Sequence, residues 1–480
     1  MTLQHGLGHQ IGLALGVLLV GVVSMPALGQ NAPPTAVPEP VGPEPAPSTA
    51  VPEPVEPEPA PPPPAPAEPA AAPKEAPPYD IWTTKKLLGD PGGLRSALSD
   101  VGIVFDPILG VAFAINTHGG ANTHRAHDIT GQMFHNITLD FDKMFGLKGS
   151  SFFFRGIQGW NSGIRPDVGS LSQPFFVIGH PGDKAIEIDK WWWRQRLFDD
   201  RLEFRLGKLL ASDLIDRNEV ADNFLSKFSN QAFFLNQTIP DAKSLGAFVR
   251  VWPVDWLYAQ VAAVDPDNDK DHHRHGTSGF ETAFHGTAHF RTYFEFGILP
   301  NKLPMDWAKR IYPGNYRFGL WYDPASKRVF IDDLGGLRAV QRQSGDVGWY
   351  FNFDQMVWKE DPSEPTDKQG LSVFARYGFA HPEVNRTNHF WSTGAAYTGL
   401  IPSRDKDTLG FGVAQSILSK TQRHNVNALA DRETVYELYY AIVVTPWCVI
   451  TPDLQVITNP GGNKNARDSL VAGVRVRIDF

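Results

Sequence analysis

Cysteine is almost absent from this chain of 480 residues, since Cys448 is the only one. A single thiol excludes an intrachain disulfide and any metal site built from several cysteines. Basic residues are also in short supply: 44 Lys and Arg stand against 52 Asp and Glu, a formal charge of −8. Nucleic-acid-binding domains carry a basic excess, so this balance argues against a general nucleic-acid binder. No stretch holds 18 consecutive apolar residues, so a transmembrane helix is not expected.

Aromatic residues, in contrast, make up 12% of the chain, including 31 Phe and 13 Trp. This abundance suggests many rings on a surface that does not face water. Half of the 40 prolines lie within residues 31–80, so the remaining 400 positions outside the amino terminus have an ordinary proline content.

The amino terminus has the pattern of a secretory signal peptide. Residues 11–23 form an apolar run of thirteen residues, which is too short to span a bilayer as a helix. The small-residue site Ala27-Leu28-Gly29 follows, which predicts cleavage near Gly29. The first ten residues contain no Lys or Arg, which is unusual for such a peptide. A buried core helix is the alternative, although the next segment offers it nothing to pack against.

That next segment is a proline-rich repeat. Residues 35–41 return unchanged at 49–55, a period of 14, and four consecutive prolines follow at 61–64. Such a composition cannot bury a core and favours extended polyproline II, with a reach of roughly 150 Å over residues 31–78. We expect a disordered periplasmic spacer, and the alternative is a tether that contacts a cell-wall or periplasmic partner. The predicted domains are therefore a signal peptide (1–29), this tether (30–80), a short periplasmic helical segment (81–100) and a barrel (101–480).

From residue 101 onward the apolar residues alternate with polar ones. In residues 470–480 every even position is apolar, while Arg475, Arg477 and Asp479 occupy odd positions. Eleven residues is the length of a tilted membrane strand. The same period of two predicts sixteen strands, at 103–115, 133–142, 150–161, 186–198, 201–209, 243–252, 255–264, 286–299, 313–322, 347–358, 370–380, 390–398, 408–418, 433–445, 448–457 and 468–480.

The links between these strands are alternately short and long. Tight turns are expected at Asp199-Asp200, Pro253-Val254 and Pro446-Trp447, and long loops at 162–185, 210–242, 265–285, 323–346 and 419–432. Short turns at one rim and long loops at the other are typical of outer-membrane barrels. A soluble β-sandwich also alternates, but its inner faces must be apolar, whereas the polar face here is rich in Arg and Glu.

The predicted fold is all-β, a transmembrane antiparallel β-barrel of about 16 strands. A short helix is expected to precede it at residues 94–98, where Leu94, Ala97 and Leu98 share one face. This helix either plugs or braces the periplasmic mouth, or packs on the tether. A bilayer allows no open sheet edge, so the strands must close on themselves.

Several blocks resemble the carbohydrate-selective porin (OprB) family. Residues 86–95 are similar to its opening Gly-Asp-x-Gly-Gly-hydrophobic-Arg block, residues 201–209 to its central Arg-Leu-Gly-Lys strand, and residues 437–440, 445–447 and 451–462 to its closing blocks. The resemblance implies a Gram-negative outer-membrane porin that contacts lipid and is assembled by the barrel-assembly machinery through its terminal aromatic, Phe480. It also implies small-molecule carbohydrates as the transported partners, and a homotrimer is left open. Pro91 replaces the usual Trp of the opening block.

The alternation also predicts which side chains face the lumen. The expected inward residues are Lys190, Trp192, Arg194, Arg196, Glu203, Arg205, Arg250, Arg291, Glu295, Arg376 and Glu437. Lys208 and Asp213 follow the Arg-Leu-Gly-Lys strand and are expected to reach a constriction from its loop. We expect Arg194, Arg196, Arg205 and Lys208 to bind sugar hydroxyls weakly, with Glu203 and Glu295 balancing charge. Solvated residues that merely brace their neighbours are the alternative. The direction of Arg155 stays open, because Phe152 to Phe154 break the alternation.

The sequence thus predicts passive, selective diffusion of monosaccharides and related small polyols, with no catalytic residue, cofactor or metal. The family tends to place acidic residues where this chain has Lys190, Trp192, Arg194 and Arg196, so an anion or sugar-acid pore is an alternative. An outer-membrane anchor that functions through the tether is another. A barrel lipase or protease is a third, but His285 and His289 have no evident partner. The segment 265–275, with three histidines, resembles a metal site, and a solvated loop is favoured there.

Overall fold

The computed structural model describes residues 79–177, 186–266, 279–280, 289–330, 341–364, 366–421 and 430–480. The expected signal peptide and the proline-rich tether lie outside these residues, so both stay predictions. The described part of the chain has no helix that is both long enough and apolar enough to cross a membrane.

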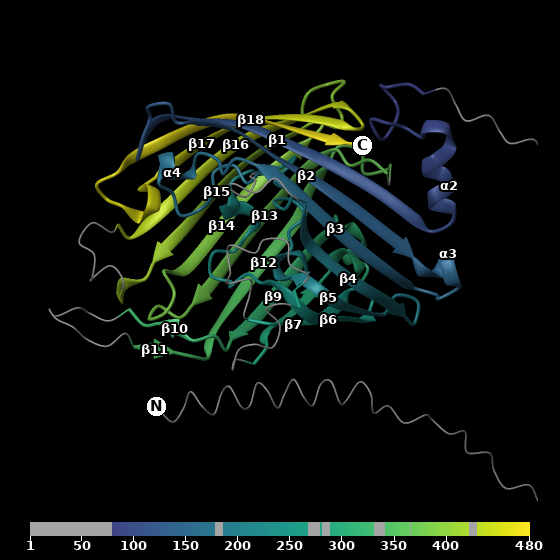
Figure 1. Cartoon of the computed structure of the whole chain (residues 1–480), viewed down its shortest axis with the longest axis horizontal. Helices are drawn as coiled ribbons and strands as arrows, with labels where there is room; N and C mark the ends of the chain where they lie inside the picture. Colours follow the sequence, from purple (N-terminus) through teal and green to yellow (C-terminus); the bar gives the residue numbers. More distant parts are fainter. Residues whose placement is uncertain are drawn as a thin grey trace, which may run out of the picture. The chain divides into compact units, whose positions relative to one another are not determined.

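Sixteen antiparallel strands close into one barrel (Figure 1). They are β1 (Ile103–Gly120), β2 (His127–Asp140), β3 (Ser150–Trp160), β4 (Glu187–Leu197), β5 (Leu202–Leu210), β6 (Lys243–Val254), β7 (Leu257–Val264), β8 (Arg291–Ile298), β9 (Gly314–Asp323), β12 (Asp346–Lys359), β13 (Gly370–Ala380), β14 (Thr387–Thr398), β15 (Thr408–Leu418), β16 (Arg432–Thr445), β17 (Cys448–Thr458) and β18 (Arg467–Asp479). Each pairs with its neighbour in sequence, and β18 closes the barrel against β1. The prediction of a sixteen-stranded barrel is confirmed.

The strands differ from the predicted ranges mainly at the loop ends. β1 and β2 extend their pairing beyond the expected limits, and β8 begins at Arg291 rather than 286. β6 continues through Pro253 and Val254, so the expected turn there moves to Asp255 and Trp256. The long loop after β9 holds a small separate hairpin, β10 (Lys327–Arg328) with β11 (Arg342–Gln343), which has too few residues to show an alternation.

The alternation in sequence becomes two different faces in space. In β16, Val435, Glu437 and Tyr439 are buried, whereas Tyr436 and Leu438 are 40% and 44% exposed. Because successive strand residues point to opposite faces, the exposed apolar set faces outward and the buried set faces the lumen. An outward apolar band and a polar interior are what a membrane barrel requires.

Short connections lie at one rim of the barrel and longer ones at the other. The first rim carries α2 (Leu94–Asp100) and α3 (Phe141–Phe145), which lie together at one end of the barrel (Figure 1). Lys143 Nζ of α3 donates to Ser99 O of α2 over 2.8 Å. The opposite rim carries β10 and β11. The remaining short helices are α4 (Arg165–Val168), α5 (Gln231–Phe234), and the 3₁₀ turns η1 (Pro91–Gly93), η2 (Ala211–Asp213), η3 (Pro300–Lys302), η4 (Ala308–Arg310) and η5 (Pro460–Gly462).

The segment before β1 braces the rim where the first and last strands meet. Leu87 N donates to Asp479 O over 2.8 Å, at the end of β18. Trp447 Nε1, in the turn before β17, donates to Ile81 O over 2.7 Å. Lys86 and Arg95 both pair with Asp106 of β1, at 3.0 and 3.4 Å. The helix expected at 94–98 is confirmed as α2. Because Arg95 of this helix contacts Asp106 of β1, the helix braces the rim of the barrel.

Two long segments fold into the barrel, residues 161–177 between β3 and β4 and residues 211–242 between β5 and β6. Their apolar side chains, among them Val168, Phe175, Phe228 and Phe233, form a buried cluster with wall residues such as Tyr439. Phe228 and Phe233 stack with ring centroids 4.5 Å apart. The lumen is therefore partly filled, because these loops pack against β13 to β18 and also against β1 to β3.

Candidate functional site

The loop 211–242 is attached to the wall by a buried guanidinium. Arg376 of β13 is 1% exposed, and its Nε lies 2.9 Å from Asp216 Oδ2. Its NH2 lies 3.2 Å from Asp222 Oδ1, and its NH1 donates to Phe233 O over 2.5 Å. One cation thus serves two loop carboxylates. Burial, only partly offset by Arg376, raises the pKa of Asp216 to about 7.

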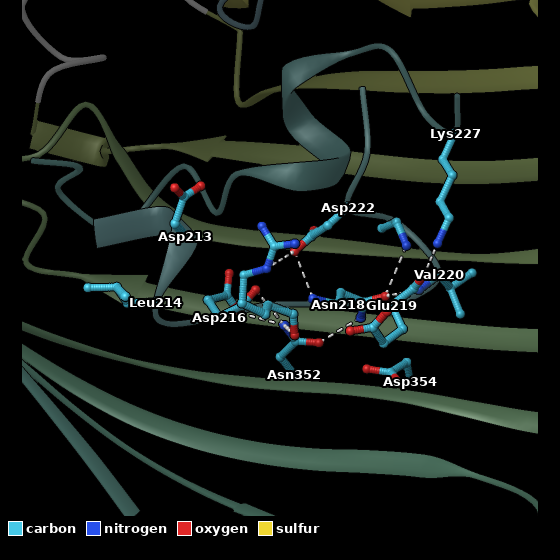
Figure 2. Close-up of polar contacts among 12 residues, drawn as sticks. Asp213, Leu214, Asp216, Asn218, Glu219, Val220, Asp222, Lys227, Asn352 and Asp354 are labelled. Carbon is cyan, nitrogen blue, oxygen red and sulfur yellow. Dashed lines mark hydrogen bonds and ion pairs between the residues drawn. The ribbon is translucent and has the colours of Figure 1, made fainter. Parts of the chain in front are cut away.

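An amide network continues this attachment (Figure 2). Asn352 of β12 donates to Asp216 Oδ1 over 2.7 Å, and Asn218 Nδ2 donates to Asn352 Oδ1 over 2.7 Å. Lys227, farther along the loop, donates to the Glu219 carbonyl. The amide groups of Asn218 and Asn352 therefore both have hydrogen-bond partners, which hold the loop in position.

Further carboxylates of the wall accept hydrogen bonds from the loop backbone. Glu295 of β8 accepts from Asp216 N over 2.7 Å, and also from Tyr350 and Tyr258 hydroxyls. Glu437 of β16 accepts from the backbone N–H groups of Ser229 and Asn230. These carboxylates fix loop peptides that have no secondary structure of their own.

Two arginines of the wall bind loop carbonyls in the complementary way. Arg475 of β18 pairs with Asp453 at 2.9 Å and donates to Phe224 O over 2.6 Å. Arg291 of β8 pairs with Asp323 at 3.1 Å and donates to Asp241 O over 3.0 Å. Four of the residues expected to face inward do so, namely Arg291, Glu295, Arg376 and Glu437. Their polar atoms, however, hold the loop and are not open to the lumen.

Between the loops and the strands β1 to β4 lies a cavity of about 530 Å³. Its lining is strongly charged, because it includes five basic and four acidic side chains: Arg155, Lys190, Arg217, Lys243 and Arg477 with Asp189, Asp213, Asp222 and Asp241. The near balance of charges leaves many hydrogen-bond donors and acceptors around a small space.

A β-bulge places two consecutive charged residues on the cavity side of β4. Arg155 of β3 pairs with Lys190, but the next residue, Gly156, pairs with Ile188, so Asp189 is the extra residue. Lys190 then contacts Asp213 of η2, while Asp189 pairs with Lys243 and lies 3.9 Å from Arg155. A bulge redirects side chains in this way. The same geometry shows the direction of the Arg155 side chain, which faces inward and donates to Asn136 Oδ1 over 2.7 Å.

Asp213 reaches the cavity from the loop, as the sequence predicts. Burial raises the pKa of Asp213. The positive charges of Lys190, Arg155 and Arg217 lower it by more than burial raises it, so the pKa lies below its usual range. The ion pair with Lys190 is therefore expected to persist into mildly acidic solution.

Four aromatic rings also line the cavity. Phe176 from the first loop contacts Phe224 and Phe234 from the second, with ring centroids 5.2 and 4.8 Å apart. Phe224 and Phe234 are 5.5 Å from each other, and Phe134 of β2 lies 6.3 Å from Phe224. A ligand there meets both aromatic rings and charged groups.

Toward the short-turn rim, β4 to β6 carry the other predicted lumen residues. Trp192 stacks on Phe153 at 4.3 Å, and the Arg205 guanidinium lies over Trp192 at 5.5 Å. Arg205 also pairs with Glu203 at 2.6 Å. Arg194 and Arg196 are the cross-strand partners of Arg205 and Glu203, and Arg250 is the partner of Glu203 on the other side. The structure therefore brings six predicted residues onto one wall.

Lys208 is the exception among the predicted residues. β5 continues to Leu210, so Lys208 lies within the strand and not in the following loop. The period of two places Lys208 on the same face as Phe204 and Leu206, which is the outer face, and opposite to Glu203 and Arg205. Its Nζ donates to Ile188 O over 2.9 Å. The expectation that Lys208 reaches the constriction is corrected on this geometry.

Residues 124–480 match the sequence pattern of the family described as "Carbohydrate-selective porin, OprB family". This is well over half of the chain. The protein belongs to this family.

Similar proteins agree with this membership. Porin B of Pseudomonas aeruginosa is 26% identical over 444 residues, which cover 83% of this chain and 92% of that protein. The high-pH structure of Pseudomonas putida OprB is 23% identical and covers 84% of this chain and all of its own, with a TM-score of 0.73. The low-pH structure of the same protein gives a TM-score of 0.53 at 20% identity. These two structures support the fold.

Membership in the OprB family, together with the barrel, places the protein in the outer membrane as a channel. In this porin the cavity occupies space between the two inward loops and the wall. Metal chemistry gains no support: among the described ranges, no three His, Cys, Asp or Glu side chains gather at a potential metal position. Most of the segment 265–275 and His285 lie outside those ranges, and Cys448 is half-buried at the start of β17.

The sequence did not identify several residues of this porin's cavity. Asp189 was missed because the bulge is not visible in an alternating pattern. Phe176, Phe224 and Phe234 were missed because loops carry no periodicity. One signal was available: residues 210–242 are long for a connection and rich in Phe and Asn, and long loops without secondary structure are often functional.

Proposed function

We propose that this porin lets monosaccharides and related small polyols diffuse through the cavity between the inward loops and β1 to β4. The observation that carries the proposal is the cavity's mixed lining, which combines the rings of Phe176, Phe224 and Phe234 with the charged groups of Arg155, Asp189 and Lys190. A pyranose has the complementary shape, with apolar C–H faces and a ring of hydroxyls at its edge. No bond is made or broken in such passage.

The ring faces favour a sugar's C–H groups, while the charged wall exchanges hydrogen bonds with its hydroxyls. The Asp189–Lys243 and Lys190–Asp213 pairs satisfy most of the charge internally, so they offer hydroxyls donors and acceptors without a strong net field. Weak, exchanging contacts of this kind allow a solute both to enter and to leave. Arg194, Arg196 and Arg205, which follow along the wall, extend the series of donors, and Glu203 balances part of their charge.

The test is single-channel current of the purified protein in a planar bilayer, with glucose or mannitol added to one side. We expect discrete open steps whose current falls as the sugar concentration rises, because a sugar in the cavity displaces ions. Protein that is folded, as judged by a heat-dependent shift in gel mobility, yet shows no steps, or steps that neither sugar alters, would overturn the proposal.

The tether is proposed as a spacer that is not needed for transport. Deletion of residues 31–80 removes no part of the described barrel, whose rim is braced from Ile81 onward. We therefore expect the shortened protein to show the same conductance and sugar block as the full chain. Loss of the channel with a correctly folded barrel would favour the anchor hypothesis, in which the tether carries the function.

Partners beyond the sugar and the lipid also stay proposals. Phe480 ends the chain directly after β18, where its backbone N–H donates to Pro107 O over 3.0 Å. Four proposals rest on the sequence alone: recognition of Phe480 by the assembly machinery, cleavage of the signal peptide, a homotrimer, and a cell-wall partner for the tether.

A further inference from the structure

The wall between the cavity and the short-turn rim has an excess of positive charge. Arg194, Arg196, Arg205 and Arg250 lie on its lumen face, and Glu203 lies among them. Arg194 and Arg205 are direct cross-strand partners. Like charges in directly opposite positions destabilise an antiparallel pair. The arrangement therefore has a cost for the empty barrel that a bound anion would remove.

Two of these guanidinium groups form no ion pair with a carboxylate of the described residues. Arg205 pairs with Glu203 at 2.6 Å, and Arg196 pairs with Asp200 at 3.0 Å. Arg194 donates its Nε to Ser151 Oγ over 3.2 Å, and Arg250 donates its Nε to Gln260 Oε1 over 2.6 Å. Neither has an acidic partner within 4 Å in the part of the chain that the structure describes.

Aromatic rings hold the same groups in place. The guanidinium of Arg205 lies 5.5 Å from the centroid of Trp192 and 5.4 Å from that of Phe248. The guanidinium of Arg250 lies 5.3 Å from Phe248 and 5.4 Å from Tyr258. An arginine has five N–H donors, and these contacts occupy few of them. The half-buried side chains thus present preorganised donors to the lumen.

We propose that Arg194, Arg205 and Arg250 form a subsite for the carboxylate of a sugar acid. The inference rests on the proposed function, because it adds a charged subsite to the same sugar pathway. Trp192 connects the two parts, since it lines the cavity and also lies under Arg205. A uronic or aldonic acid leaving the cavity reaches these donors with its carboxylate, and charge-assisted hydrogen bonds to guanidinium are the strong ones.

The test compares glucuronate with glucose, which share a pyranose ring and differ in the carboxylate. Half-blocking concentrations are measured from single-channel currents of the full chain. In the wild-type protein we expect glucuronate to block at about tenfold lower concentration, the ratio expected from one charge-assisted hydrogen bond. In Arg194→Gln/Arg250→Gln the ratio of the two concentrations falls to about one, since the unneutralised charges are gone.

The matched control is Arg201→Gln/Arg310→Gln, which removes two exposed arginines from the short-turn rim and is expected to keep the wild-type ratio. A wild-type ratio near one, with glucose still blocking, overturns the subsite and leaves the proposed function intact. A high ratio that survives in Arg194→Gln/Arg250→Gln overturns the assignment to these residues. Absence of block by either compound in folded wild-type protein overturns both proposals.

Discussion

Replacement of Arg376 by methionine is expected to widen the pore and to abolish its block by glucose. Arg376 is buried and pairs with both Asp216 and Asp222, so its removal leaves two carboxylates without their cation. Breaking a buried pair in this way costs about 3–5 kcal/mol. The barrel retains its sixteen strand pairings, so we expect the cost to release the loop 211–242 and not to unfold the wall.

The release should be visible as a single-channel conductance about twofold or more above wild type, because a loop that narrows the lumen has moved. Arg432→Met is the matched control: Arg432 begins β16 at an exposed position, and its loss should leave conductance and block unchanged. An Arg376→Met channel with wild-type conductance and normal glucose block would contradict the view that this loop forms the constriction.

The same variant should depend on pH in a defined direction. The pKa of Asp216 is about 7 in the folded wild-type protein, above its ordinary value, and loss of the Arg376 charge, which lowers it, raises it further. Stability from a raised acid pKa is present at low pH and is lost as pH rises through the folded value. We therefore expect the conductance increase of Arg376→Met to grow as the pH is raised from 5 through the alkaline range. Increases that stay equal from acidic to strongly alkaline pH would exclude Asp216 as the titrating group.

Replacement of Lys190 by methionine is expected to shift the channel toward cations. Lys190 contacts Asp213, and its neighbour Asp189 lies on the same side, so the variant leaves the cavity with four basic and four acidic side chains instead of five and four. One charge at about 4 Å changes the energy of an ion by about 1 kcal/mol in a water-like medium. We expect the potassium-to-chloride permeability ratio, measured by the reversal potential across a salt gradient, to rise about 30-fold, because the cation gains and the anion loses about 1 kcal/mol.

A second variant separates charge from structure. In Lys190→Met/Asp213→Asn the negative partner is removed as well, so the permeability ratio should return close to the wild-type value. Lys406→Met, at an exposed position in the turn before β15, is the matched single-charge control and should leave the ratio unchanged. If the single and double variants have the same ratio, Asp213 does not act on the permeating ions.

The barrel was predictable because every strand shows the same alternation of apolar and polar residues. Each strand must place apolar groups toward lipid and polar groups toward water, and this requirement produces a period of two in the sequence. The rim brace was partly predictable, since the helix at 94–98 is amphipathic. Its partner Asp106, however, belongs to the alternating pattern of β1 and gives no sign of a bond to Lys86 or Arg95.

The constriction was less predictable, because its contacts join residues far apart in the chain. Glu437 and Asn230 are 207 residues apart, and no local pattern links them. The alternation placed Glu295, Arg376 and Glu437 on the correct face, but it does not distinguish a free lumen residue from one that holds a loop. Lys208 was misplaced because the period of two within β5 puts it on the outer face with Phe204 and Leu206, and this alternation was not applied to it.

The proposed constriction is tested most directly by the swelling rates of liposomes that contain the purified full-length protein. The rates are compared for glucose, a disaccharide and a trisaccharide at equal osmolarity, beside Arg376→Met. A constriction that fits single sugar rings predicts rapid swelling with glucose, a steep fall between one sugar ring and two, and a shallow fall in Arg376→Met. Equal rates for all three sugars in the wild-type protein, or no swelling with glucose, would contradict the claim that the inward loops form a constriction for single sugar rings.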